Sequence, residues 1–243
     1  MSNPDAAADT SLPAQMQRRW YNSAAFNPAD PWADLDVTRA AVVLVDLINW
    51  QAHPDGSSLM AVRAAGRGDQ VDYVVGRCAE MVMPGLRDVL PAARAAAVPI
   101  VHVRLASRSK DYDDLVPAFQ PYLRGSGALD GDPCTEPVEG LWEDGDISVV
   151  KRGSGAFSSD LDRLLRERGI DTVLYAGVLT SACVLLSAAT GFDLGYRQYL
   201  LADATAAFTP ADQEAAERFI GTYLAQIVTT ASAAAALRKR AAG

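Results

Sequence analysis

Short apolar segments rich in β-branched residues alternate along this chain with segments of helical periodicity, and this alternation restricts the possible folds most strongly. The apolar segments lie at 41–45, 99–103, 147–150, 172–176, 197–201 and 227–229. A short apolar run without polar alternation is typical of a strand buried on both faces. Strands that alternate with helices form βαβ units. The sequence therefore predicts an α/β fold: a doubly wound, six-stranded, mostly parallel sheet with helices on both faces.

Helical periodicity fills much of the sequence between these strands. It predicts helices at about 84–97, from the capping box Ser159-Asp-Leu-Asp to a stop at Gly169, and at 182–194, 210–223 and 231–240. A long polar stretch follows the first strand. Residues 105–145 form a long connection, whose length indicates a functional or partner-facing role.

The first 36 residues differ in composition from the rest of the chain. They are rich in Ala, Pro, Asp and Asn and are interpreted as an N-terminal arm (1–36), followed by one domain (37–243). Four aromatic side chains of the arm need an apolar surface, on the domain itself or on a neighbouring subunit: Trp20, Tyr21, Phe26 and Trp32.

Charge and composition exclude several classes of protein. The 243 residues carry a net charge of −8, which argues against nucleic acid as the main partner, because phosphate binding needs a basic face. No apolar run approaches the roughly 18–20 residues of a membrane-spanning helix, and the first residues do not resemble a signal peptide. The three cysteines form no CxxC motif, so neither a disulfide scaffold nor a cysteine-rich metal site is expected, and a reducing cytoplasm is the predicted location.

Polar residues follow three of the predicted strands. Asp46 follows the first, Lys151 the third, and the segment from Gly177 to Cys183 the fourth. In an open parallel sheet, ligands bind beyond the carboxyl ends of the strands. We therefore expect a carboxylate, an ammonium and a thiol to meet at one edge of the sheet.

Cys183 is the candidate nucleophile of this group. It lies near the start of a predicted helix, where free N–H groups, the helix dipole and Lys151 are expected to lower the pKa of its thiol. Asp46 could accept the thiol proton and return it to a leaving amine. The alternative is that Cys183 is a small buried apolar residue, as Cys78 and Cys134 are interpreted to be. The combination with Asp46 and Lys151 favours catalysis.

The chain has only two histidines, His53 and His102, and neither follows a predicted strand as a general base should. A cysteine–histidine pair of the protease type is therefore not expected. No G-x-S-x-G motif is present, which argues against a serine hydrolase of the α/β type.

Four segments, in order, resemble those of the isochorismatase-like cysteine hydrolases: Val45–Asn49, Lys151–Phe157, Gly177–Val184 and Asp203–Ala207. The resemblance implies a catalytic triad of Asp46, Lys151 and Cys183, with no cofactor. It also implies a cis peptide between Val178 and Leu179, and an oxyanion hole formed by the N–H groups of Leu179 and Cys183.

Within that superfamily the chain is most similar to the branch of N-carbamoylsarcosine amidase and ureidoacrylate amidohydrolase, through Thr180–Cys183 and the long insertion after Asp46. This branch implies hydrolysis of a C–N bond in a small linear amide, carbamoyl or ureido compound through a thioester. A larger or cyclic amide, a nicotinamidase-like amidase and a non-catalytic member remain alternatives. Nicotinamidases carry a metal-binding Asp and several His before the second strand, whereas this chain offers only His53 there, so no metal is expected.

The resemblance also suggests substrate contacts and an assembly. Asn49, Trp50 and Phe157 are candidate substrate-binding residues, although core packing is as plausible for Trp50 and Phe157. Arg104 and Arg108 could bind a substrate carboxylate; the alternative is a solvated loop or an ion pair with Asp111, Asp113 or Asp114. The family implies a homodimer or homotetramer, in which a neighbouring subunit often completes the pocket.

Overall fold

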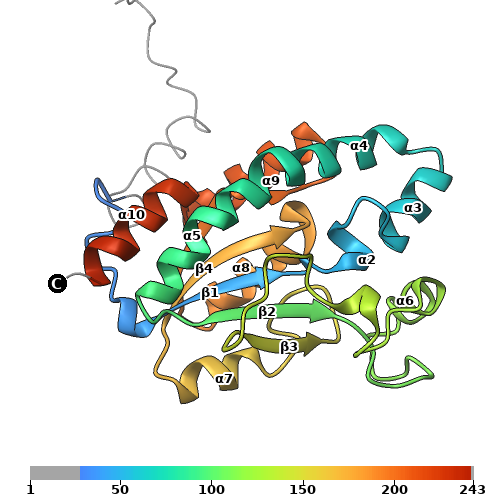
Figure 1. Cartoon of the computed structure of the whole chain (residues 1–243), viewed down its shortest axis with the longest axis horizontal. Coiled ribbons are helices and arrows are strands. Elements are labelled where there is room, and N and C mark those ends of the chain that lie inside the picture. Colours follow the sequence, from blue (N-terminus) through green and yellow to red (C-terminus); the bar gives the residue numbers. More distant parts are fainter. Residues whose placement is uncertain (1–27, 242–243) are drawn as a thin grey trace, which may run out of the picture.

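The computed structural model describes residues 28–241 and contains one six-stranded sheet (Figure 1). All neighbouring strands are parallel, in the order β3-β2-β1-β4-β5-β6. This confirms the predicted fold class. The strands are β1 (Ala40–Val45), β2 (Ile100–Leu105), β3 (Ile147–Lys151), β4 (Thr172–Val178), β5 (Arg197–Ala206) and β6 (Gln226–Val228).

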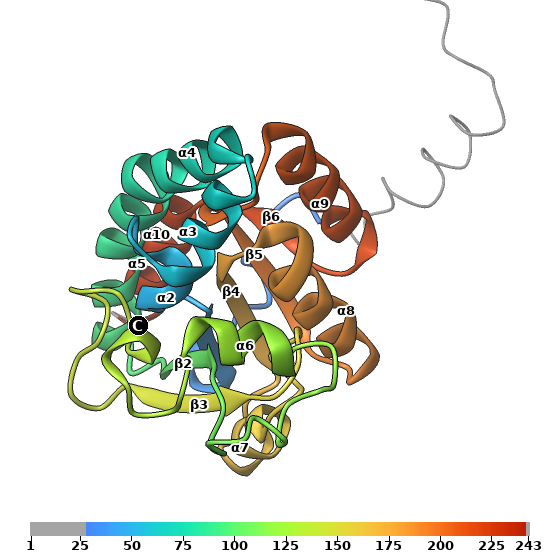
Figure 2. The same ribbon diagram turned by 90° about the vertical axis from the view of Figure 1, so that its right-hand side faces the viewer.

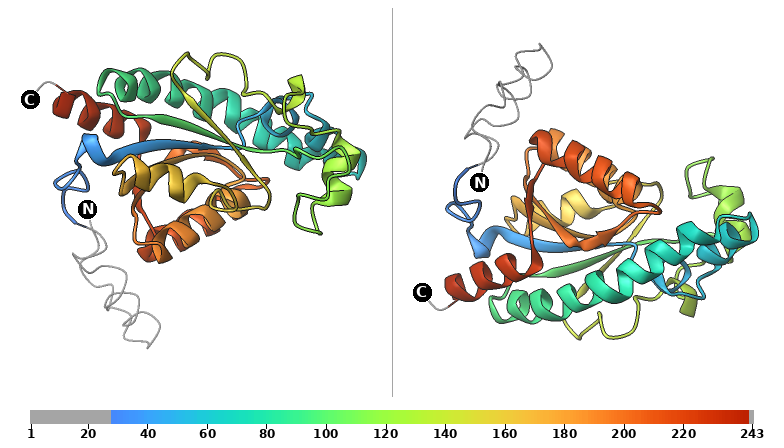
Figure 3. Two further views of the ribbon diagram at one scale, coloured as in Figure 1. Left: turned by 90° about the horizontal axis from the view of Figure 1, so that it is seen from below. Right: turned by 90° about the horizontal axis from the view of Figure 1, so that it is seen from above.

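Helices cover both faces of the sheet, and the two views of Figure 3 show them as separate layers. One layer holds α5 (Met83–Ala95) and α10 (Thr230–Ala241). The other holds α7 (Leu161–Glu167), α8 (Leu185–Asp193) and α9 (Pro210–Tyr223). No helix within 28–241 has both the length and the apolar character to cross a membrane.

Each face of the sheet has its own apolar core, and β1 contributes to both. Val42 and Leu44 pack on the side of α5 and α10, whereas Val43 and Val45 pack on the side of α7, α8 and α9. All six residues of β1 are buried. Burial on two faces explains why this strand consists only of apolar residues.

The order of the strands places a topological switch between β1 and β4. The chain moves from β1 through β2 to β3 on one side, and from β4 through β5 to β6 on the other. In sheets of this kind the crevice for a ligand opens where the connections diverge, beyond the carboxyl ends of the strands. Figure 2 looks at that end, where α2 (Asn49–Ala52), α3 (Ser57–Ala64) and α6 (Gln120–Ser126) lie.

The polar stretch after β1 is more helical than its sequence indicates. Besides α2 and α3 it contains α4 (Gly68–Arg77), which continues through a π-turn, η2 (Cys78–Val82), into α5. Helix α4 buries only Val71 and Val74, so its apolar stripe is narrow. The remaining described elements are short: the 3₁₀ segments η1 (Val37–Arg39) and η3 (Pro133–Thr135), and the π-turn η4 (Thr180–Val184).

The described part of the arm packs on the domain beside β5. The Trp32 ring stacks on the Tyr199 ring, with centroids 4.6 Å apart, and the Tyr199 hydroxyl donates to the Pro31 carbonyl over 2.7 Å. Leu35 is buried in the core. The other three aromatic residues of the arm, Trp20, Tyr21 and Phe26, lie outside the described residues.

Candidate active site

Asp46 is the first residue beyond β1, and its side chain is completely buried. Its backbone has a left-handed φ of 55°, which turns the chain out of the sheet. Its N–H still donates to the Val103 carbonyl of β2, over 2.9 Å. One carboxylate oxygen, Oδ1, accepts from the Leu105 N–H at 2.9 Å. The end of β2 thus fixes the orientation of the carboxylate.

Lys151 is the last residue of β3, and its side chain is also completely shielded from solvent. Its Nζ lies 2.7 Å from Asp46 Oδ2 and donates to the Ser154 carbonyl. Oδ2 is paired with the ammonium by charge but has no well-aligned hydrogen-bond donor among residues 28–241. A lone pair of this oxygen therefore remains available for a proton.

Cys183 lies in η4, directly after the turn that follows β4. Gly177, the second-last residue of β4, leads into this turn; it has a φ of +126° and lies opposite Val45 in the parallel ladder. A Cβ atom at Gly177 would lie 2.0 Å from the Val45 carbonyl oxygen, so only glycine fits. The Val178–Leu179 peptide bond is cis.

Two serines connect Cys183 to the loop after β3. Ser154 Oγ lies 3.5 Å from Cys183 Sγ. Ser187 Oγ donates to the Cys183 carbonyl over 2.5 Å and accepts from the Ala156 N–H over 2.8 Å. The loop after β3, which contains Ser154 and Ala156, is therefore attached to η4 and α8, the helical segments around the thiol.

The surroundings of Cys183 disfavour the thiolate form of its side chain. Burial and the Asp46 carboxylate raise the pKa of Cys183 to about 11, against the opposing effect of the Lys151 ammonium. The expectation of a lowered pKa was wrong. In a buried site the cost of desolvating a thiolate exceeds the gain from one cation and a helix terminus.

The two partners of the ion pair are shifted in the same direction. Burial raises the pKa of Asp46, although Lys151 and the hydrogen bonds to the carboxylate oppose the shift. Burial opposes the charged form of Lys151, but Asp46 and Cys183 outweigh it and raise the pKa of the ammonium. Asp46 is consequently a stronger proton acceptor than an exposed aspartate, beside a lysine that stays charged.

Cys183 opens into a cavity of about 260 Å³ beyond the ends of β1 and β4. This volume is below the roughly 300–1,000 Å³ of sites for drug-sized ligands, so the cavity suits a smaller molecule. Apolar side chains form much of its wall. The lining residues are Gln51, Ser58, Leu59, Val62, Arg67, Tyr122, Val178, Leu179, Cys183 and Phe208.

None of the three proposed substrate contacts lines this cavity. Asn49 Nδ2 donates to the Pro133 carbonyl. Trp50 is 1% exposed, and its indole N–H donates to the Leu105 carbonyl over 3.1 Å. Phe157 stacks on Tyr196. These contacts give all three residues a role in packing or loop fixation.

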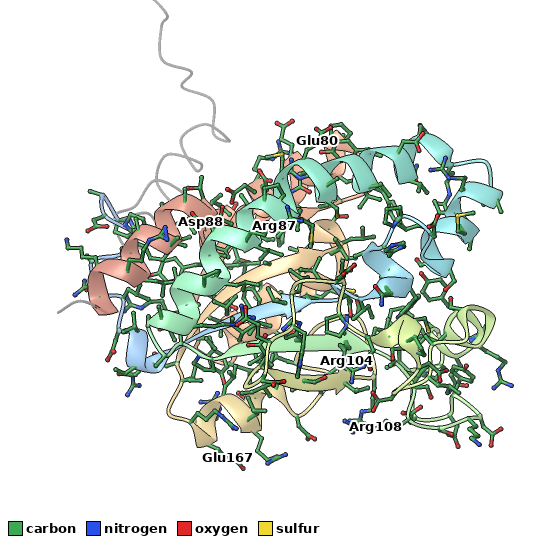
Figure 4. The ribbon with its side chains drawn as sticks, viewed as in Figure 1. Glu80, Arg87, Asp88, Arg104, Arg108 and Glu167 are labelled. Atoms are coloured by element: carbon green, nitrogen blue, oxygen red, sulfur yellow. The ribbon has the colours of Figure 1, made fainter. Side chains whose placement is uncertain are left out.

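Arg104 and Arg108, labelled in Figure 4, are both engaged with Asp130. Arg104 lies in β2, is largely buried, and makes further hydrogen bonds to Ser148 and Thr135. Neither arginine lines the cavity. Of the alternatives considered, the ion pair with Asp111, Asp113 or Asp114 is replaced by the pairs with Asp130, and Asp114 instead accepts from the Arg108 backbone N–H over 2.9 Å.

The two histidines take no part in the cavity. His102 is buried, with Nε2 3.1 Å from Asp146 Oδ2, and burial lowers the pKa of its imidazole. The His53 side chain is half exposed beside Asp55. No group of three or more His, Cys, Asp or Glu side chains within residues 28–241 has the arrangement of a metal site.

Four polar residues of the cavity were not identified from the sequence: Gln51, Ser58, Arg67 and Tyr122. The first three belong to the stretch after β1, and Tyr122 belongs to α6 in the connection after β2. Ser58 and Tyr122 form a hydrogen bond of 2.5 Å that joins α3 to α6. The only signal for this region was the length of the two connections, which does not indicate which side chains reach the site.

Comparison with protein families gives one match over most of the chain. The Isochorismatase domain model matches residues 70–232. Ureidoacrylate amidohydrolase RutB of Azorhizobium caulinodans is 31% identical in an alignment of 186 residues that covers 70% of this chain and 77% of that protein. Across three curated relatives the match spans 59%, 77% and 39% of the relative's own length.

Solved structures show the same fold. A cysteine hydrolase from Pseudomonas syringae pv. phaseolicola superimposes with a TM-score of 0.71 and 25% identity, over 85% of this chain and 95% of that one. N-carbamoylsarcosine amidase from Thermoplasma acidophilum gives a TM-score of 0.56 and 25% identity, over 79% of this chain and 96% of that one.

Proposed function

The chain belongs to the isochorismatase domain family, and we propose that it is a cysteine-dependent amidohydrolase that cleaves a C–N bond of a small linear amide, carbamoyl or ureido compound. One observation carries the proposal: the Cys183 thiol opens into a small cavity beside the buried Asp46–Lys151 ion pair. The similarity to a ureidoacrylate amidohydrolase and an N-carbamoylsarcosine amidase supports this substrate class.

The first half of the reaction forms a thioester. Asp46 Oδ2 takes the proton of the Cys183 thiol, and Sγ attacks the carbonyl carbon of the substrate. The carbonyl electron pair moves to oxygen, giving a tetrahedral oxyanion. When this intermediate collapses, the C–N bond breaks and the departing nitrogen takes the proton from Asp46. The proton that Asp46 takes from the thiol is therefore the one that it later gives to the departing nitrogen.

The oxyanion needs hydrogen-bond donors at the point where its charge develops. Leu179 and Cys183 both line the cavity. Within 28–241 the Leu179 N–H has no acceptor, while its carbonyl accepts from the N–H groups of Ala182 and Val184. We assign the N–H groups of Leu179 and Cys183 as the oxyanion hole.

The second half hydrolyses the thioester. Water attacks the thioester carbon while Asp46 takes a proton from it, and the C–S bond then breaks with return of that proton to Sγ. Lys151 stays charged throughout. Its ammonium opposes the rise that burial causes in the pKa of Asp46 and stabilises the negative charge that passes from the carboxylate to sulfur.

The test is ammonia release from a panel of ureido acids, carbamoyl compounds, primary amides and nicotinamide. The Cys183→Ala variant is expected to release none. Cys78→Ala is the matched control, because Cys78 is also 7% exposed but lies in η2, away from the cavity. Mass spectrometry of acid-quenched enzyme is expected to show the acyl group on Cys183. Turnover that survives in Cys183→Ala would overturn the proposal.

A further inference from the structure

The walls of the cavity differ in chemistry from one part to another. Leu59, Val62 and Phe208 supply apolar surface, and the lining includes no acidic side chain. Two lining residues carry polar groups that nothing in the described chain satisfies, Gln51 and Arg67. Both come from the insertion between β1 and β2, so neither belongs to the strand ends that carry the triad.

Gln51 presents an acceptor without a donor. Its Oε1 is buried, and no donor within residues 28–241 reaches it. Gln51 lies in α2, between Trp50, which is fixed by its hydrogen bond to Leu105, and Ala52, which is buried. An unpaired buried amide oxygen is destabilising, and a ligand N–H group in the cavity would remove that cost.

The Arg67 guanidinium has no acidic partner among the described residues. Arg67 lies between α3 and α4, is exposed, and is one of the residues that line the cavity. Its guanidinium forms no ion pair or hydrogen bond with any residue from 28 to 241, whereas its neighbour Arg63 is paired with Asp72 at 2.6 Å. No carboxylate of the described residues therefore competes with an anionic ligand for Arg67.

Building on the proposed function, we propose that Gln51 and Arg67 select the substrate: Gln51 Oε1 accepts a hydrogen bond from a substrate N–H group, and Arg67 binds an anionic group at the end of the substrate away from Cys183. The cavity is thereby matched to a short ureido or carbamoyl acid rather than to a neutral amide. The insertion after β1 supplies both contacts.

The role of Arg67 is tested by alkylation of Cys183, which requires no hydrolysis. Two reagents of similar size, neutral N-ethylmaleimide and anionic 3-maleimidopropionate, are compared by mass spectrometry of the Cys183 peptide. Replacing Arg67 by Gln is expected to lower the rate ratio of anionic to neutral reagent about tenfold at low salt, and much less at high salt. Arg63→Gln is the matched control and keeps the wild-type ratio. An unchanged ratio in Arg67→Gln would overturn the assignment.

The role of Gln51 is tested with a second pair of reagents. Acrylamide carries an N–H group that its ester analogue methyl acrylate lacks. In Gln51→Leu the rate ratio of acrylamide to methyl acrylate at Cys183 is expected to fall about fivefold. The urea midpoint of this variant is expected to stay the same or rise, because an unpaired acceptor is removed. In the control Gln120→Leu the midpoint falls, because Gln120 donates to the Leu115 carbonyl over 3.1 Å, and the ratio is unchanged. A wild-type ratio in Gln51→Leu would contradict the proposal.

Hydrolysis assays then distinguish this inference from the proposed function. With 3-ureidopropionate as substrate and propylurea as its neutral analogue, Arg67→Gln is expected to raise KM for the acid about tenfold with little change in kcat. If alkylation follows the charge of Arg67 but no compound is hydrolysed, the selection is correct and the proposed reaction is wrong. If hydrolysis requires Cys183 but is indifferent to both substitutions, the reaction is correct and the selection is wrong.

Discussion

The Lys151 ammonium lies 2.7 Å from Asp46 Oδ2, and both side chains are completely removed from solvent. The two residues follow or end different strands, with β2 between them. Lys151 pairs in register with Leu105, whose N–H holds the other carboxylate oxygen. The ends of three neighbouring strands therefore set the position of the two side chains relative to each other.

Replacing one partner of this pair is expected to destabilise the protein far more than replacing both partners. Lys151→Met leaves a buried carboxylate without its counter-ion and is expected to lower the free energy of unfolding by about 3–5 kcal/mol. The double variant Lys151→Met with Asp46→Asn is expected to recover most of that loss but no activity. Urea unfolding measures the first effect and ammonia release the second.

The exposed pair of Arg39 and Asp171 is the control for this cycle, because each side chain is about half exposed. Arg39→Met is expected to change the free energy of unfolding by less than about 1 kcal/mol. A double variant at Asp46 and Lys151 that is as unstable as the sum of its single variants would contradict the buried-pair argument.

Titration of Cys183 is expected to make the protein less stable in alkali. The pKa of the thiol is about 11 in the folded protein and 9.0 ordinarily, so folding favours the neutral form. The corresponding stability is fully present below about pH 9 and is lost as the pH rises towards 11. Relative to Cys183→Ala, the wild type should lose about 2–3 kcal/mol over this interval. Parallel pH profiles of the two proteins would contradict the raised pKa.

Much of the fold, and the placement of Asp46, Lys151 and Cys183 at or just beyond strand ends, could be predicted because strand burial and strand ends leave a clear signal. The apolar segment at 41–45 predicted β1 and placed Asp46 at its end. The helix at 210–223 was predicted with the bounds that the structure shows. The Ser159 capping box was wrong: Asp160 occupies the N-cap position, and Ser159 Oγ instead accepts from the Leu161 N–H and donates to the Ala156 carbonyl.

The cavity wall could not be predicted, because it depends on where two insertions pack. Ser58 and Tyr122 lie 64 residues apart in sequence, and their hydrogen bond joins α3 to α6, as does the bond from the Ser57 hydroxyl to the Ser126 carbonyl. From the sequence, Trp50 suited a pocket wall and the core equally well; its ring packs in the core with Ile48 and Leu105, and its indole N–H donates to the Leu105 carbonyl. Local patterns carry no information about such long-range contacts.

Chelation is expected to leave hydrolysis unchanged. His102 is occupied by Asp146, and His53 lies on the surface beside Asp55. The proposed chemistry uses proton transfer between Asp46 and Cys183 and requires no Lewis acid. Ammonia release is measured before and after dialysis against a chelator, with metal analysis of the dialysed protein. Activity that disappears on dialysis and returns with added zinc would show that this mechanism is wrong.

Gly177 and Gly76 are expected to respond to the same substitution in opposite directions. At Gly177 the φ of +126° and the 2.0 Å approach of a Cβ atom to the Val45 carbonyl oxygen leave no room for alanine. Gly177→Ala should lower the free energy of unfolding by about 3 kcal/mol or more, and should reduce turnover because the turn carrying Leu179 and Cys183 must move.

Gly76 lies within α4, and an added Cβ atom would meet nothing within 4 Å. Gly76→Ala should raise the free energy of unfolding by about 0.5–1 kcal/mol and leave turnover unchanged, because alanine reduces the entropy of the unfolded chain and suits a helix. Urea unfolding and ammonia release are measured on both variants. A Gly177→Ala protein as stable and as active as wild type would show that the close approach of β4 to β1 does not fix the position of the nucleophile.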